Sequence, residues 1–377
     1  MKRIVFVSAA TFFGIVLVLF IIFLGNKSNG PLSGALEDIG NLVIDVEQDY
    51  LLNQREPIRQ KELSWFQEYR LDIEKLRSPD TLLFGVFDNE YQNNFENILS
   101  FDHHLGFTLP ILHIYVAWGD KPREKFPMIY VKSIHDLGSI PMITWEPWLN
   151  DFDRESHGLE WLEDPNVEGM KALANGDYDF YIEEWSKQVA DFGHPIFIRF
   201  GHEMNDPYRY PWGPQNNQPE DFVAAWKHVI DVFRKNDVDN VIWIWAPQPS
   251  HLLYAEYYPG HDYVDWVGVG ALNYGTVASW SQWWTFKEIF GDYYYWLDMI
   301  DKPQMITEMG SLKVGGNRTQ WFREAFNHLP TKYPRIKSIL FFNHSEDNTT
   351  FNKSLDWSIA KDTVTCKAIH QSIIETW

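Results

Sequence analysis

The sequence predicts an α/β protein, a (β/α)₈ TIM barrel with an N-terminal transmembrane helix. Two observations predict the barrel. Beyond residue 80, short β-rich apolar runs alternate with amphipathic helical stretches, and such alternation implies a parallel sheet. There are eight of these runs, the number that closes a barrel of parallel strands. A third observation, a long uncharged run near the start of the chain, predicts the membrane helix.

The uncharged run extends from Ile4 to Leu24. At 1.5 Å per residue it covers about 30 Å, the thickness of a bilayer's hydrocarbon core. Lys2 and Arg3 precede it and only Lys27 closely follows it, so the positive-inside rule places the N-terminus in the cytoplasm. The alternative is a cleaved signal peptide, whose apolar region is shorter and ends in small residues. We expect residues 1–27 to be an uncleaved anchor, with the rest of the chain extracytoplasmic, at the cell surface or in the periplasm.

The segment that follows, residues 28–78, is interpreted as a linker and a helical stalk. Its first residues are rich in Asn, Ser, Gly and Pro, which is typical of a flexible connection. Residues 35–78 are rich in Glu, Gln, Arg and Leu, with apolar residues at helical spacing. This pattern fits either a stalk or a helix packed on the barrel. Residues 79–377 are predicted to form the barrel domain.

The eight predicted strands are Thr81–Phe87, Ile111–Trp118, Ile140–Trp145, Pro195–Phe200, Val241–Ala246, Trp266–Leu272, Gln304–Thr307 and Ile336–Phe342. The clearest predicted helices between them are Asp179–Phe192, Pro219–Asn236 and Thr319–Leu329. Pro219 stands at a first helical position with acidic residues directly after it, as helix N-termini prefer. No glycine-rich phosphate loop follows the first strand, which disfavours an open nucleotide-binding sheet.

Composition excludes several classes of function. The net charge is −20, so a nucleic-acid partner is not expected. Cys366 is the only cysteine, which rules out an intrachain disulfide and a cysteine-ligated zinc site. The His-Glu-x-x-His zinc motif does not occur either. We expect no metal, no cofactor and a monomer.

Polar and aromatic residues follow each predicted strand, where barrel enzymes carry their active sites. Two of these residues are glutamates: Glu203 follows the fourth strand and Glu308 follows the seventh. A single glutamate after a strand is usually a helix cap or a salt-bridge partner. Two that open onto one mouth can flank one glycosidic bond, and retaining enzymes hold such carboxyl groups about 5–5.5 Å apart. Arg199 and Tyr274 are candidate donors to Glu308; for Arg199 the alternative is a structural ion pair.

Here the sequence resembles a known family. The segments Arg199–Asn205 and Tyr210–Gly213 look like the acid/base region of glycoside hydrolase family 26, and Ile306–Gly310 is similar to its nucleophile strand. That family holds β-mannanases and mixed-linkage β-glucanases with retaining (β/α)₈ domains. The resemblance implies that Glu203 is the acid/base, that Glu308 is the nucleophile, and that His202 contacts the sugar nearest the cleaved bond.

Two departures from the family pattern bear on the substrate. Mannanases of the family follow His-Glu-Met-Asn with a glycine and aromatic residues, whereas this chain has Asp206–Trp212, closer to the glucanase-like members. The last strand ends Phe341-Phe342-Asn343 where a tryptophan is expected. Both departures weaken the case for mannan, and neither touches the two glutamates.

The aromatic residues at the strand ends predict an open groove in which sugar rings stack. The residues expected to bind substrate, besides His202, Arg199 and Tyr274, are Asn205, Trp118, Trp145, Trp148, Tyr208, Tyr210 and Trp212. For Trp118 and Trp145 a place in the core is the alternative. The prediction is an endo-acting hydrolase of β-1,4 links in a β-glucan or β-mannan. The alternatives are a glycan-binding protein without activity and a membrane-anchored trimming factor in exopolysaccharide synthesis or export.

Overall fold

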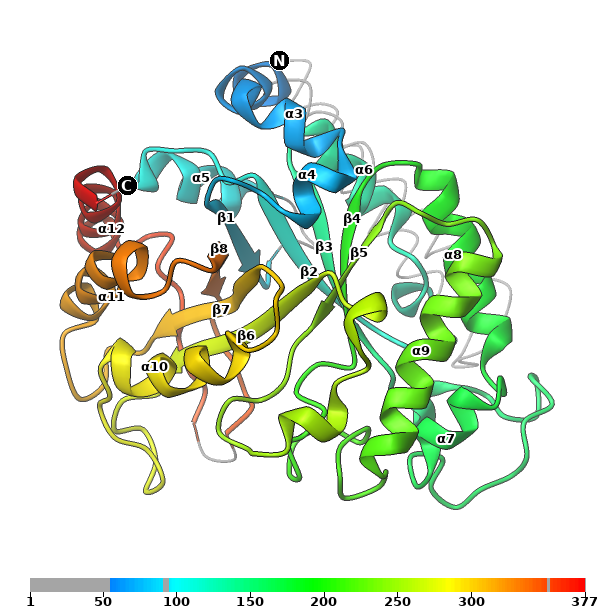
Figure 1. Ribbon diagram of the computed structural model, residues 1–377. Coiled ribbons are helices and arrows are strands. Elements are labelled where there is room, and N and C mark those ends of the chain that lie inside the picture. Colours follow the sequence, from blue (N-terminus) through cyan, green and yellow to red (C-terminus); the bar gives the residue numbers. More distant parts are fainter. Residues whose placement is uncertain (1–54, 91–94, 351–352, 377) are drawn as a thin grey trace, which may run out of the picture. The chain divides into compact units, whose positions relative to one another are not determined.

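The computed structural model describes residues 55–90, 95–350 and 353–376. In these residues eight parallel strands close into a barrel in sequence order, with β1 paired to β8 (Figure 1). Every strand overlaps a predicted run, so the predicted barrel is confirmed. The strands are β1 (Leu83–Asp88), β2 (Ile111–Ala117), β3 (Ile140–Glu146), β4 (Ile196–Phe200), β5 (Val241–Trp245), β6 (Trp266–Asn273), β7 (Gln304–Ser311) and β8 (Ile336–Asn343).

Helices cover the outside of the barrel, with α8 and α9 on one flank and α10 to α12 on another (Figure 1). Predicted helices 179–192, 219–236 and 319–329 correspond to α8, α9 and α11. The helices are α3 (Gln67–Arg70), α4 (Ile73–Arg77), α5 (Glu96–Leu105), α6 (Met128–Asp136), α7 (Gly169–Ala174), α8 (Asp179–Phe192), α9 (Pro219–Lys235), α10 (Phe286–Leu297), α11 (Arg318–Lys332) and α12 (Thr363–Thr376).

The predicted membrane anchor, residues 1–27, lies outside the described residues. Within the described ranges, no helix combines the length and the apolar character that crossing a membrane requires.

The barrel has two separate hydrophobic cores because successive strand residues point to opposite faces of the sheet. The larger core lies between the strands and the surrounding helices. The smaller one lies inside the barrel, where side chains of the strands meet side chains of the segment before β1; its strand members include Met142, Phe197, Ile244 and Met305. Since bulky apolar side chains fill this part of the interior, the polar side chains of the strands lie nearer the other end of the barrel.

The N-terminal end of the barrel is closed by residues 55–77. Residues 55–62 are helical, and the 3₁₀ turn Ser64–Phe66 and helices α3 and α4 follow. Leu63, Phe66 and Leu76 are fully buried against the interior core. The indole of Trp266 in β6 donates a 2.9 Å hydrogen bond to the carbonyl of Leu76. Residues 55–77 therefore belong to the same packed unit as the barrel.

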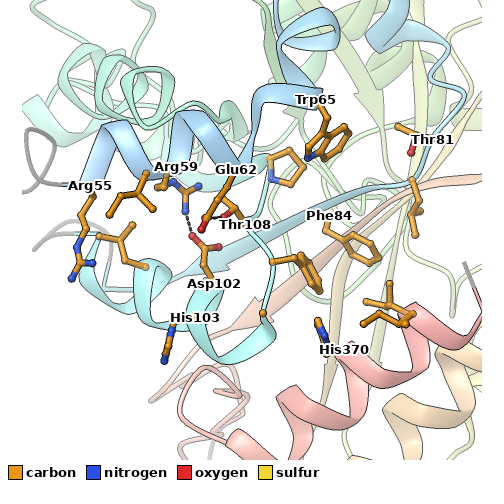
Figure 2. A pocket seen from close by; sticks show the side chains of 18 residues that line it. Arg55, Arg59, Glu62, Trp65, Thr81, Phe84, Asp102, His103, Thr108 and His370 are labelled. Atoms are coloured by element: carbon orange, nitrogen blue, oxygen red, sulfur yellow. Dashed lines mark hydrogen bonds and ion pairs between the residues drawn. The ribbon is translucent and has the colours of Figure 1, made fainter.

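Arg59 joins this segment to the start of the barrel. Its guanidinium pairs with Asp102 of α5 and donates to the carbonyls of Leu109 and Leu137, both at 3.1 Å. Figure 2 shows Arg59 and Asp102 pointing toward each other beside a cavity of about 790 Å³. Because this buried cation is fully paired, the closed end of the barrel is held by polar as well as apolar contacts.

Candidate active site

Glu203 stands in a tight turn directly after β4. Both Gly201 and Glu203 have positive φ, 46° and 54°. A positive φ is costly for a residue with a side chain, and such residues cluster at functional sites. The turn is held because the Glu203 N–H donates to the carbonyl of Ala246 at 2.7 Å, beyond the end of β5. This tie turns the carboxylate toward the mouth of the barrel.

The carboxylate of Glu203 is largely buried and has two polar partners. Gln248 Nε2 donates to it at 2.9 Å, and Arg209 Nη1 lies 3.4 Å from its other oxygen. Burial raises the pKa of Glu203 to about 7, and the negative charge of Glu308 adds to this effect while Arg209 opposes it. A carboxyl group with this pKa can hold a proton near neutral pH, as a general acid must.

Glu308 is delivered by an irregularity in β7. The pairing with β6 skips Thr307, since Ile306 pairs with Val269 and Glu308 with Gly270; the pairing with β8 is also irregular there. Consecutive residues of a regular strand point to opposite faces, but a β-bulge re-aims them. Here both Thr307 and Glu308 reach the same arginine inside the barrel. The bulge therefore places the carboxylate at the mouth.

Arg199 and Tyr115 hold the carboxylate of Glu308. Arg199 Nη2 donates to Glu308 Oε1 at 2.7 Å, and the Tyr115 hydroxyl donates to the same oxygen at 2.7 Å. Burial and the adjacent Glu308 charge raise the pKa of Tyr115 well above its usual value, so its hydroxyl stays a donor. Two donors on one oxygen hold the Glu308 carboxylate in one orientation at the mouth.

Arg199 is itself fixed below the mouth. It is only 2% exposed, and its remaining hydrogen bonds go to Thr144 in β3 and Thr307 in β7, at 2.8 and 2.9 Å. Arg199 also donates to the Tyr115 hydroxyl at 2.9 Å. The prediction that Arg199 faces Glu308 agrees with these contacts. The predicted contact of Arg199 with substrate does not agree with them, because other groups of the protein accept the hydrogen bonds that its guanidinium donates.

Both glutamates line one cavity of about 480 Å³ at the mouth of the barrel. Its other lining residues come from the loops after β4 and β5, from β6 and its following loop, and from α10; among them are Arg209, Gln248, Tyr274, Trp280, Trp284 and Tyr293. Glu203 and Glu308, more than 100 positions apart in the sequence, thus meet at one solvent-accessible site. Tyr274 belongs to this site, although the donor role expected of it toward Glu308 is filled by Tyr115.

The side chain of Asn205 holds the loop after β5, which forms one wall of the cavity. Its side-chain amide donates to the carbonyls of Gln248 and His251 at 3.0 and 2.9 Å and accepts from the Gln248 N–H at 2.7 Å. Asn205 is buried, so its predicted contact with a sugar hydroxyl is wrong. The amide instead fastens the loop after β5, and this holds Gln248 against Glu203.

His202 lies beside the acid/base candidate with an aromatic support. Its Nε2 is 3.0 Å from the Tyr210 hydroxyl, and its backbone carbonyl accepts from the indole of Trp212 at 2.8 Å. Trp212 stacks on Tyr210 with ring centroids 4.6 Å apart. Burial keeps the pKa of His202 well below its usual value, so the ring is neutral. Its Nδ1 is buried and has no hydrogen-bond partner among the residues that the structure describes.

The aromatic residues predicted to line the groove divide into two groups. Trp118 and Trp145 are 0% exposed and pack on each other, and Trp212 is 1% exposed beneath Tyr210. The prediction that these three offer a surface for sugar is wrong, because their strand or loop positions turn them toward the helices or under other rings. Trp148 and Tyr210 are partly exposed at the mouth, while Tyr208, 83% exposed, lies on the rim.

Four residues of the site carried no signal that singled them out as catalytic neighbours. Tyr115 is an aromatic residue inside an apolar strand, and it looks like core. Arg209 and Gln248 follow strands, as expected of mouth residues, but their contact with Glu203 depends on loop shape. Glu146 is the last residue of β3 and directly follows the predicted strand Ile140–Trp145, and this position alone indicated a place at the mouth. Across the parts of the chain that the structure describes, no group of histidine, cysteine and acidic side chains could hold a metal ion.

Known proteins resemble this chain in sequence. The family model of glycosyl hydrolase family 26 matches residues 157–352. Endoglucanase H of Acetivibrio thermocellus is 32% identical over 286 residues, which are 73% of this chain and 29% of that protein. Mannan endo-1,4-beta-mannosidase of Bacillus subtilis is 23% identical over 218 residues, 52% of this chain and 55% of that protein. The chain thus spans well under two thirds of either relative.

Solved structures agree in fold. A Bacillus subtilis mannanase has a TM-score of 0.54 at 17% identity, covering 80% of this chain and 87% of that one. A family 26 β-mannanase from Bacteroides ovatus has a TM-score of 0.52 at 16% identity, covering 79% and 90%. The family model covers more than half of the chain and includes both glutamates. The chain belongs to glycosyl hydrolase family 26.

Proposed function

We propose that this protein is a retaining, endo-acting glycoside hydrolase that cleaves β-1,4 linkages in a β-glucan, with β-mannan as the alternative polymer. One observation carries the proposal: two buried carboxylates line a single cavity in opposite electrostatic settings. Burial raises the pKa of Glu203 to about 7, whereas Glu308 is paired with Arg199. Glycoside hydrolysis with retention needs one acid and one anionic nucleophile.

In the first step a Glu308 oxygen attacks the anomeric carbon while Glu203 gives its proton to the glycosidic oxygen. The carbon–oxygen bond to the leaving chain breaks, and an ester between sugar and Glu308 forms. Arg209 and Gln248 contact the Glu203 carboxylate and stabilise the charge that it acquires.

In the second step the ionised Glu203 takes a proton from water, and the water oxygen bonds to the anomeric carbon. The ester breaks, Glu308 recovers its negative charge, and Glu203 is again protonated. Arg199 and Tyr115 donate to the oxygen on which this charge returns. Two inversions at one carbon leave its configuration unchanged.

The shape of the site supports endo action. The cavity is open, and exposed or partly exposed aromatic side chains extend from it, including Trp280, 60% exposed, and Trp284. An open cleft accepts an internal segment of a polymer. Identity favours glucan: the endoglucanase relative is 32% identical, against 23% for the mannosidase.

Reducing ends released from lichenan, carboxymethylcellulose, glucomannan and galactomannan test the proposal. Wild type should act on the glucans, and Glu203→Ala and Glu308→Ala should each lose about three orders of magnitude or more in rate. Glu163→Ala, an exposed carboxylate in the loop after β3, is the matched control and should keep wild-type rates. Azide should rescue Glu308→Ala and give a glycosyl azide of inverted configuration. Equal rates for wild type and both mutants would favour a glycan-binding protein without activity.

We also propose that residues 4–24 anchor the protein in a membrane with the barrel outside the cytoplasm. The support is the length of the uncharged run and the positive residues before it. N-terminal sequencing of the mature protein tests this, since a start near residue 26 means cleavage. An anchored hydrolase would also suit trimming of an exported polysaccharide.

A further inference from the structure

A third carboxylate, Glu146, faces the mouth of the barrel at the end of β3. Side chains of β3 alternate: Thr144 points inward to Arg199, and Trp145 points outward to Trp185 of α8, with ring centroids 4.5 Å apart. Glu146 is therefore the next inward residue, one layer above Thr144 and nearer the mouth. Neither step of the proposed reaction uses it.

The residues on either side of Glu146 are small and leave space around its carboxylate. In β2 it pairs with Ala117, whose side chain is a single methyl group. On the other side lies Gly201, whose N–H donates to the Trp145 carbonyl at 3.0 Å and which has no side chain. Glu146 thus sits in a niche that neither flanking strand fills, and it is partly exposed.

A short turn brings an indole to this carboxylate. The Trp148 N–H donates to the Glu146 carbonyl at 2.9 Å across Pro147, and the indole Nε1 donates to Glu146 Oε2 at 3.2 Å. The ring of Trp148 is set edge-on against Trp212, with centroids 5.4 Å apart. Within the described residues the Glu146 carboxylate accepts this hydrogen bond on Oε2, and the indole is held in one orientation beside it.

The strand order separates this pair from the cavity already described. Around the closed barrel, β5 and β6 lie between β4 and β7 on one side, and that side carries Gln248, Tyr274 and Trp280. The other path around the barrel, from β7 to β4, passes through β8, β1, β2 and β3. Glu146 and Trp148 therefore lie on the part of the mouth beyond Glu203, where a polymer crossing the catalytic pair would continue.

The electrostatic setting of Glu146 suits contact with neutral hydroxyl groups. Burial raises its pKa to about 7, the Trp148 N–H and Arg199 oppose this, and Glu308 adds to it. Near neutral pH the group can accept hydrogen bonds when ionised and donate one when protonated. A carboxyl beside a fixed indole offers polar and apolar contacts at once, as recognition sites for small polar ligands do.

We propose that Glu146 and Trp148 form a sugar subsite, in which one pyranose ring stacks on the indole and the carboxylate accepts hydrogen bonds from its hydroxyls. Glu146 is then a specificity-determining residue, since the hydroxyl positions it reaches differ between epimers. This inference rests on the proposed function.

Calorimetry of sugar binding to the full-length Glu308→Ala protein tests the subsite separately from the proposed hydrolase activity, because that variant does not turn over substrate. The probes are a mixed-linkage β-glucan tetrasaccharide and β-1,4-mannotetraose. Adding Glu146→Gln, which keeps the shape but removes the charge, should raise Kd for the preferred probe about tenfold or more, the loss of a hydrogen bond to a charged group. Trp148→Phe, which keeps a ring but loses the N–H, should raise Kd less, and Glu163→Gln should leave it unchanged.

The second measurement is steady-state kinetics of protein in which Glu308 is intact. Glu146→Gln should raise KM by a similar factor with kcat within about threefold, because the subsite binds substrate without taking part in bond breaking. Intact binding with an unchanged Kd in Glu146→Gln would overturn the subsite and leave the hydrolase standing. A Glu308→Ala protein that binds neither probe would overturn the proposed function itself.

Discussion

Replacing Tyr115 with phenylalanine tests the nucleophile's setting most directly. The change removes one oxygen, which donates to Glu308 Oε1 at 2.7 Å and accepts from Arg199 at 2.9 Å. The ring stays, and so do its contacts with Phe87 and His113, each with centroids 4.7 Å apart. The variant should therefore fold normally, so that any change in rate reports the lost hydroxyl.

The size of the effect follows from the type of hydrogen bond. A hydrogen bond to a charged group is worth about 1.5–3 kcal/mol, and each 1.36 kcal/mol is about tenfold in rate. Charge returns to Glu308 when the glycosyl ester breaks, so the second step should lose most of this stabilisation. Arg199 still donates to the same oxygen, which favours the lower end of the range. We expect deglycosylation to slow by about tenfold.

The assay is stopped-flow release of an aryl leaving group from an activated aryl β-glycoside. Tyr115→Phe should show a burst followed by slow turnover, because the ester accumulates. Mass spectrometry of the quenched enzyme should find the added sugar on Glu308. Tyr295→Phe, 66% exposed on α10, is the matched control and should behave as wild type. A folded Tyr115→Phe enzyme with wild-type kcat and no burst would refute the reasoning.

Three further results are expected. Arg209 lowers the pKa of Glu203, so Arg209→Gln should move the alkaline limb of the kcat/KM profile from about pH 7 to higher pH; a shift to lower pH would contradict the ion pair. Because folding raises the pKa of Glu203 from 4.5 to about 7, the native state binds more protons than the unfolded state between these two pH values, and stability falls as the pH rises from about 4.5 through about 7. Glu203→Gln should therefore have a higher Tm than wild type at pH 8, with the difference vanishing near pH 4; the reverse order at pH 8 would be inconsistent with a buried charge. Trp145→Ala should lower the free energy of unfolding in denaturant titrations by about 3–5 kcal/mol, as loss of a core tryptophan does, whereas a sugar platform would change KM and leave stability intact.

The strands could be predicted from sequence because each is a short apolar run bounded by turn residues. The position of the mouth could then be predicted from the strands, since all parallel strands of a barrel end on the same side. Which side chains at the mouth face the cleft depends on the pleat of each strand. Trp145 and Glu146 are adjacent, yet one packs under helices and the other faces the mouth.

Two other features of the site depend on three-dimensional detail. The bulge at Thr307 is not visible in the sequence, because an extra residue changes pairing and leaves composition unremarkable. Asn205 has the chemistry of a sugar ligand, and only the course of the loop after β5 shows that its amide is engaged. Residues 55–77 read as a helical stretch, but their packing beneath the strands needed the barrel interior to be known.

The segment that closes the N-terminal end of the barrel has a practical consequence. The first described residue, Arg55, lines the same cavity as Thr81, which stands just before β1, and Figure 2 shows these two residues at opposite ends of that cavity. Arg55 thus lies at the end of the barrel remote from the two glutamates. Attachment of the barrel to a surface at Arg55 itself would leave the open end clear, so immobilised enzyme should still accept polymers too long to enter a pocket.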